Sequence, residues 1–132
     1  MAQANLVNEK QEIITGNDNI VIVDILESIR GGLTLDVSGF APDVIKAGHV
    51  IIQETETKEY KPMPVNSGNT AYDELPKGHV YAGILIQSIL TKRPMAGILV
   101  RGTVNTAVTP YPMTEILEDV EKALHRINFR ED

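Results

Sequence analysis

Three histidines are the first residues to consider as catalytic or metal-binding groups. His49, His79 and His125 lie far apart in the chain, and no two of them have the HxH or HxxxH spacing of a metal site. A metal would bind only if the fold brought them together with a carboxylate. Their spacing favours structural positions at strand ends and near a helix end, so the sequence predicts no metal site.

The acidic and hydroxyl side chains give no clearer catalytic pattern. Asp24, Glu27 and Asp36 lie on or near apolar runs, where a carboxylate pair could perform acid–base catalysis. Acidic side chains on the solvent face of a half-buried strand are far more common. The serines stand outside any G-x-S-x-G motif, at Ser28, Ser38, Ser67 and Ser88. The sequence predicts no catalytic residue, no cofactor site and no enzyme activity.

Composition narrows the class of protein. The chain has 132 residues, the size of one domain, and 42% of them are hydrophobic but only 5% are aromatic. A core of Ile, Val and Leu favours β structure. The formal net charge of −6 argues against nucleic acid as a partner, and the absence of cysteine excludes disulfides. No signal peptide and no apolar run of about 18 residues is present, so we expect no membrane partner.

The order of polar and apolar segments predicts an arm and one domain. We expect an N-terminal arm over residues 1–19, because this stretch is polar and ends in the turn-like sequence TGNDN. The domain then covers residues 20–132. Apolar runs over 20–29 and 33–37 predict strands, with a turn at Gly31-Gly32 between them.

The middle of the chain predicts two pairs of strands. Residues 50–60 read as a hairpin with a charged tip, and 66–78 read as a long loop of the kind that often forms a contact surface. Two strands follow, over Tyr81–Leu90 and Met95–Val104, each containing the phrase AGIL, with a four-residue connection. We expect them to form a hairpin at the centre of a small barrel-like sheet. Gly102 inside the second strand predicts a bulge or a close backbone approach, and Arg101 beside it could form an interface ion pair.

The C-terminal segment has the pattern of an amphipathic helix over about residues 113–128. Prolines at 110 and 112 mark its start, acidic residues follow, and basic residues lie near its end. Apolar residues recur at helical spacing along one face, at Met113, Ile116, Leu117, Val120, Leu124 and Ile127. The predicted fold class is therefore mainly β with a C-terminal helix.

Three short motifs, in this order, resemble the head decoration (auxiliary capsid) proteins of tailed bacteriophages of the lambda type. The first combines IKAGHVI at 45–51 with EYKPM at 59–63. The second is AGIL at Ala82–Leu85, and the third is GILVRGTVN at Gly97–Asn105. Each motif alone is short, and their order and spacing carry the likeness. The resemblance covers roughly residues 33–105, a little over half of the chain.

The resemblance implies a small β-tulip fold whose copies associate, often as trimers, on the outer face of a capsid. The partners it implies are the major capsid protein and other copies of the chain, with the arm contacting the shell. Such a protein is made in the host cytoplasm, resides on the virion exterior and stabilises the head. A small domain buries only about 60–70% of its chain surface alone, which also favours oligomerisation.

Three other functions remain open from the sequence. A head-fibre base or a tail adaptor would share the same composition and trimeric assembly. A trimeric all-β nucleotide hydrolase would match in size, but the chain lacks the Ser-rich phosphate motif and the substrate-binding Tyr hairpin of that class. The third alternative is a soluble β module of a cell. Binding to capsid shells distinguishes the decoration function from these alternatives.

Overall fold

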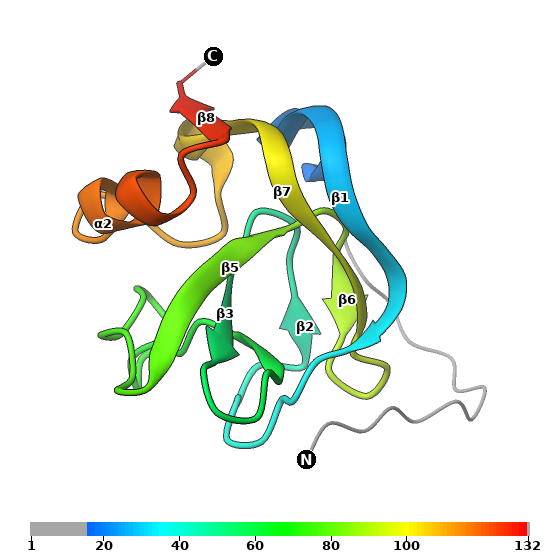
Figure 1. Ribbon diagram of the computed structural model, residues 1–132, viewed down its shortest axis with the longest axis vertical. Coiled ribbons are helices and arrows are strands. Elements are labelled where there is room, and N and C mark those ends of the chain that lie inside the picture. The colour runs from blue at the N-terminus through cyan, green and yellow to red at the C-terminus, as the bar shows by residue number, and fades with distance from the viewer. Residues whose placement is uncertain (1–15, 132) are drawn as a thin grey trace.

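Residues 16–131 are described by a computed structural model, and they form a mainly β protein with a short C-terminal helix, as predicted. The main sheet has the strand order β1-β7-β5-β3-β4, with β8 paired to β7 (Figure 1). Its strands are β1 (Ile22–Thr34), β3 (Val50–Glu54), β4 (Tyr60–Pro62), β5 (His79–Leu85), β7 (Met95–Asn105) and β8 (Ile127–Arg130). A second sheet contains only β2 (Val44–Ile45) and β6 (Ile89–Leu90). The sheets are not closed, which corrects the expectation of a barrel, because β1 and β4 end the main sheet without pairing to each other.

The central strands are buried on both faces. Alternate residues of β3, β5 and β7 enter two separate apolar clusters. One cluster contains Val50, Ile52, Ile84 and Leu99, and the other contains Ile51, Leu85 and Ile98. This double burial explains why these strands are continuous apolar runs instead of alternating polar and apolar residues.

The two AGIL phrases lie side by side, but they do not form a simple hairpin. β5 and β7 pair antiparallel through Ile84 with Leu99 and Leu85 with Ile98, which places the phrases together in the sheet. The chain between them leaves the main sheet and forms β6, which pairs with β2, so the predicted strand Tyr81–Leu90 is two strands. A side chain at Gly83 would strike both the Ile98 side chain and the Leu99 backbone, so close approach of β5 and β7 requires glycine there.

β1 is one long, irregular strand. It pairs antiparallel with β7 from Ile22 opposite Val104 to Thr34 opposite Met95, with several register shifts. The strand continues through residues 31–32, so the turn predicted there is wrong. A register shift between Ile29 and Leu33 accommodates the two glycines instead.

The close approach predicted at Gly102 is confirmed. Its φ is 155°, and a Cβ atom there would collide with the backbone oxygen of Asp24 on β1. Glycine tolerates this conformation where other residues are strained. On β1, a register shift between Ile25 and Glu27 lies opposite Arg101 and Gly102 of β7.

The hairpin predicted over 50–60 is confirmed. Gln53 pairs with Tyr60, and the turn between β3 and β4 carries the charged residues at its tip. The predicted loop over 66–78 is also free of named strands, with one isolated bridge between Val65 and Tyr72. Tyr72 is buried and is therefore an anchor of this loop in the core.

The C-terminal segment corrects the predicted helix of 113–128. The helix α2 covers only Leu117–Ala123, and Ile127–Arg130 form β8, which pairs in parallel with β7 from Gly102 to Asn105. The apolar face is nevertheless buried, since Met113, Val120, Leu124 and Ile127 all belong to one core cluster. Ile127 lies opposite Gly102 in this parallel pairing and is 5% exposed, so the segment extends the sheet and still buries its last apolar residue. Figure 1 shows α2 and β8 together at one end of the sheet.

The boundary predicted at residue 19 lies inside a helix. The four-residue helix α1 (Asp18–Val21) precedes β1, and Val21 is buried in the core. Residues 1–15 of the predicted arm lie outside the described residues. No helix in the described part of the chain has the length and apolar character needed to cross a membrane.

Candidate functional site

The three histidines occupy separate environments. His49 is buried, His79 begins β5, and His125 is exposed after α2. The Lys61 ammonium donates to Nε2 of His79 over 3.2 Å, and Nδ1 of His79 lies 2.9 Å from the carbonyl of Lys77. Within residues 16–131, no three His, Asp or Glu side chains gather closely enough to hold a metal ion.

The acidic and hydroxyl residues considered from the sequence also lie apart. Asp24 and Glu27 are exposed on β1. Burial by itself raises the pKa of Asp36, but hydrogen bonds from the hydroxyl and amide of Ser38 hold the pKa at about 2. This carboxylate therefore stays ionised and serves a local turn.

Ser88 has a structural contact that the sequence did not indicate. Its amide and hydroxyl both donate to the carboxylate of Asp18, at 2.9 and 2.7 Å, across a separation of 70 residues. The amide of Ala47 donates to the same hydroxyl over 3.0 Å. These bonds fasten α1 to the segment between β5 and β6, so Asp18 belongs to the folded domain and not to an independent arm.

His49 lies at the centre of an aromatic cluster. Its ring meets Phe40, Tyr72 and Tyr111 edge-on, with ring centroids 5.1–5.6 Å apart. Its Nε2 lies 2.9 Å from the carbonyl of Met63 and must donate, because a carbonyl oxygen only accepts. Nδ1 is buried and has no hydrogen-bond partner in the part of the chain that the structure describes. Burial lowers the pKa of His49 to about 4, so the ring is neutral near pH 7.

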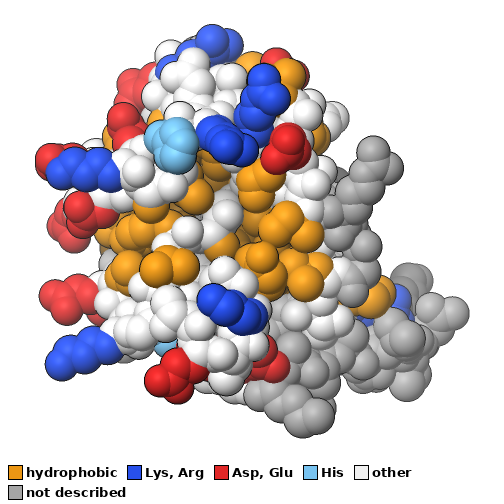
Figure 2. Space-filling model, in the orientation of Figure 1, with side chains coloured by type: hydrophobic (Ala, Val, Ile, Leu, Met, Phe, Trp, Pro, Cys, Tyr) orange, Lys and Arg blue, Asp and Glu red, His pale blue; other side chains and the backbone are white. Residues whose placement is uncertain are grey.

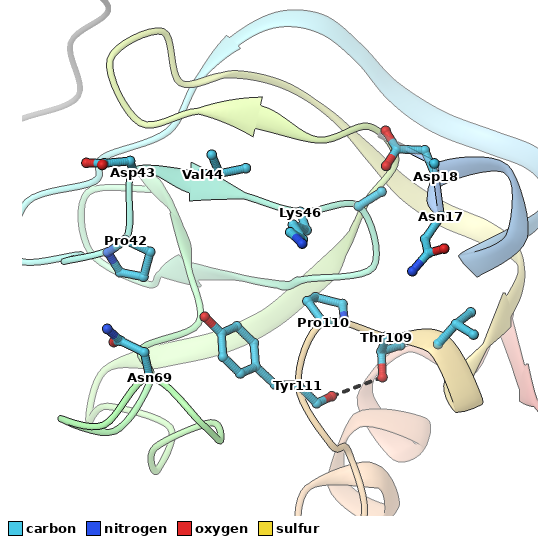
Figure 3. A pocket seen from close by; sticks show the side chains of 13 residues that line it. Asn17, Asp18, Pro42, Asp43, Val44, Lys46, Asn69, Thr109, Pro110 and Tyr111 are labelled. Carbon is cyan, nitrogen blue, oxygen red and sulfur yellow. Dashed lines mark hydrogen bonds between the residues drawn. The ribbon is translucent and has the colours of Figure 1, made fainter. Parts of the chain in front are cut away.

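A cavity of about 630 Å³ opens beside this cluster and collects polar groups from four segments (Figure 3). Asp43 and Lys46 flank β2, Asn69 comes from the long loop, and Tyr111 precedes α2. Asn17, Asp18 and Thr109 complete the polar wall. Its volume is in the range of small-molecule sites, about 300–1,000 Å³.

A second cavity of about 430 Å³ lies between the 36–41 segment and the long loop. It is more apolar, with Phe40, Ile52 and Val65 in its wall. Its charged groups already have partners, because Lys61 bonds to His79 and lies 3.7 Å from the carboxylate of Glu54. These contacts close a polar network within the wall, so this cavity offers fewer groups to a ligand.

The edge of the main sheet forms a different kind of surface. Within the described residues, β1 pairs only with β7, so its outer edge has no strand beside it. Large apolar side chains are exposed along this edge and on α1, at Ile20, Val23, Ile25 and Leu26. Figure 2 shows apolar side chains on the face where β7 and β1 lie. We call these four residues the β1 patch.

Comparisons with protein-family models, with curated proteins and with solved structures found no match to this chain. The two features of the described residues that bear on function are the β1 patch and the cavity of about 630 Å³.

Sequence reasoning missed both of these features. The run over 20–29 predicted a strand, but the sequence carried no sign that the strand would be an edge with its apolar residues exposed. Asp43, Lys46 and Tyr111 stand in no motif, and only the fold brings them together. The only sequence feature that pointed to the cavity was the length of the 66–78 loop, which predicted a contact surface. This loop contributes Asn69 to the cavity.

Proposed function

We propose that this chain is a structural virion protein that binds the outer surface of a tailed-phage capsid and stabilises it. Its partners are the major capsid protein and further copies of itself, the latter as a trimer. The proposal places it on the virion exterior after synthesis in the host cytoplasm. The ordered motifs over residues 33–105 support this function, and they fall on the β3–β4 hairpin, β5 and β7, four adjacent strands of the main sheet.

The observation that carries the proposal is the β1 patch. Leu26 is 60% exposed and Ile25 is 49% exposed on a strand whose outer edge is unpaired among residues 16–131. Open, apolar strand edges invite pairing with another chain, and soluble monomers usually protect them with charge, proline or a covering segment. Asp24 and Glu27 interrupt the run, but its apolar side chains remain exposed. An assembly protein has a use for such an edge, because its partner covers it.

Binding only to the assembled shell would stabilise the capsid by mass action. A ligand that binds one state stabilises it by RT ln(1 + [L]/Kd), about 2.7 kcal/mol at a concentration 100 times Kd. Many copies on one shell multiply this effect over its lattice. No covalent chemistry is needed for this function.

Co-sedimentation tests the proposal. The full chain is mixed with empty, expanded capsid shells of the phage that encodes it, and we expect saturable pelleting at a fixed ratio to the major capsid protein. Leu26→Lys should abolish pelleting, because it places a charge in the contact. Val80→Lys is the matched control, since Val80 is 45% exposed on β5, outside the β1 patch, and should pellet like the parent chain.

Two results contradict the proposal. If the parent chain fails to pellet with shells, the protein does not decorate capsids, and a fibre-base or adaptor function takes its place. If both lysine variants pellet fully, the chain binds shells through a surface other than the β1 patch.

A further inference from the structure

The cavity of about 630 Å³ contains polar side chains that the fold itself leaves unused. The Asp43 carboxylate, the Lys46 ammonium, the Asn69 amide and the Tyr111 hydroxyl make no hydrogen bond or ion pair within the described part of the chain. Two other polar groups of the wall have partners, because the Asp18 carboxylate accepts from Ser88 and the Thr109 hydroxyl donates to the carbonyls of Thr106 and Tyr111. In the second cavity, by contrast, Lys61 and His79 already form a hydrogen bond with each other.

The Tyr111 ring is held in place before any ligand arrives. It meets His49 at 5.6 Å and Tyr72 at 5.2 Å between ring centroids. Burial raises the pKa of Tyr111, so its hydroxyl remains protonated and can donate as well as accept. A ring fixed by its neighbours loses little conformational entropy on contact with a ligand.

Figure 3 shows the flat face of this ring among the other lining residues. In this view Pro42 and Pro110 lie to either side of the ring, Asn69 lies on the side of its hydroxyl, and Lys46 lies above Pro110. The cavity therefore offers an aromatic and proline surface surrounded by hydrogen-bonding groups. Such a surface suits a ligand that has a flat apolar face and a polar perimeter.

The mixture of charges narrows the ligand class. Asp43 only accepts hydrogen bonds, Lys46 only donates them, and Asn69 does both. Two carboxylates and one ammonium on the wall disfavour a phosphate or another anion. A sugar ring has hydroxyls that both donate and accept, and it presents C–H groups on one face, which make weak contacts with an aromatic ring.

We propose that this cavity is a saccharide-binding site. Tyr111 packs against the C–H face of one sugar ring, and Asp43, Lys46 and Asn69 hydrogen-bond to its hydroxyls. The inference is independent of the β1 patch, because the four residues of that patch are not among those that line the cavity.

Saturation-transfer NMR and calorimetry on the full chain test this site. The probes are D-glucose, D-galactose, D-mannose and N-acetyl-D-glucosamine, with inorganic phosphate as the anionic comparison. We expect at least one sugar to bind and phosphate not to bind. Asp43→Ala and Lys46→Ala should each weaken that sugar about tenfold or more, because each removes a hydrogen bond to a charged group. Tyr111→Leu should remove saturation transfer to the C–H protons.

Lys77→Ala is the matched control, because Lys77 is an exposed cation that lines neither cavity, and it should bind like the parent chain. Asp43 and Lys46 are exposed, so their variants keep the test valid if Tyr111→Leu fails to fold. The inference is overturned if none of the four sugars binds, if phosphate binds instead, or if sugar affinity is the same in the Asp43 and Lys46 variants as in the parent chain.

Discussion

Strands β1 and β3 have similar apolar sequences and opposite environments. Val50, Ile51 and Ile52 of β3 are at most 1% exposed, whereas Val23, Ile25 and Leu26 of β1 are 39–60% exposed. β3 lies between β5 and β4 with apolar clusters on both faces, and β1 lies at the end of the sheet. The same residue types therefore stabilise the fold in one strand and leave a surface for a partner in the other.

The largest loss of stability is expected from a substitution in β3. Ile51→Ala removes buried methyl groups and leaves a space in the cluster with Leu85 and Ile98, so the free energy of unfolding should fall by about 2–5 kcal/mol. Urea denaturation of the parent and the variant measures the difference. A loss below about 1 kcal/mol would mean that β3 is less tightly packed than its burial indicates.

A second, smaller effect on stability is expected from protonation of His49, the residue directly before β3. The pKa of His49 is about 4 in the folded chain against 6.5 for the free side chain, so the unfolded state binds more protons between these two pH values. The free energy of unfolding should therefore fall as the pH drops from 6.5 to 4, by up to about 3 kcal/mol, and His49 should contribute no further loss below pH 4.

Denaturation curves at a series of pH values measure this dependence, with His49→Gln as the comparison. The glutamine variant lacks the titrating ring and should lose most of the slope in this pH range. An equal slope in both proteins would assign the pH dependence to other groups. Of the aromatic neighbours of His49, Tyr72 and Tyr111 can titrate, and burial raises the pKa of both, so both remain neutral throughout.

The smallest change in stability is expected from a substitution in β1. Leu26→Ala shortens a side chain that is 60% exposed, so the free energy of unfolding should change by no more than about 0.5 kcal/mol. The same urea titration used for Ile51→Ala makes the two results directly comparable. A loss as large as that of Ile51→Ala would show that Leu26 packs within the fold and is not available to a partner.

Much of the main sheet could be predicted because its strands have strong local signals. The β3–β4 hairpin and the antiparallel neighbours β5 and β7 follow from β-branched runs and turn residues, and Gly102 correctly indicated a close backbone approach. The sequence also identified Met113, Val120 and Leu124 as buried. Burial could be predicted more reliably than secondary structure because apolar side chains leave water in either conformation.

The errors occurred where pairing between distant segments outweighed local preference. Ile127 continued a helical pattern but joined the free side of β7, and Ile89–Leu90 left the predicted hairpin to pair with β2. The segment expected to turn at Gly31-Gly32 stayed within β1 for the same reason, because β1 pairs with β7 on both sides of a register shift between Ile29 and Leu33. Asp18 and Ser88 could not be paired from the sequence, since their 70-residue separation leaves no local signal.

The sequence alone determined that this chain is mainly β, that its core is largely aliphatic, and that Met113, Val120, Leu124 and Ile127 are buried. These properties depend on the composition and spacing of side chains within one segment. The tertiary structure alone decided that the apolar residues of β1 are exposed while those of β3 are covered, and that Asp43, Lys46, Asn69 and Tyr111 share a cavity. Exposure and convergence depend on which other segment packs against each residue, and the local pattern of a chain does not specify that partner.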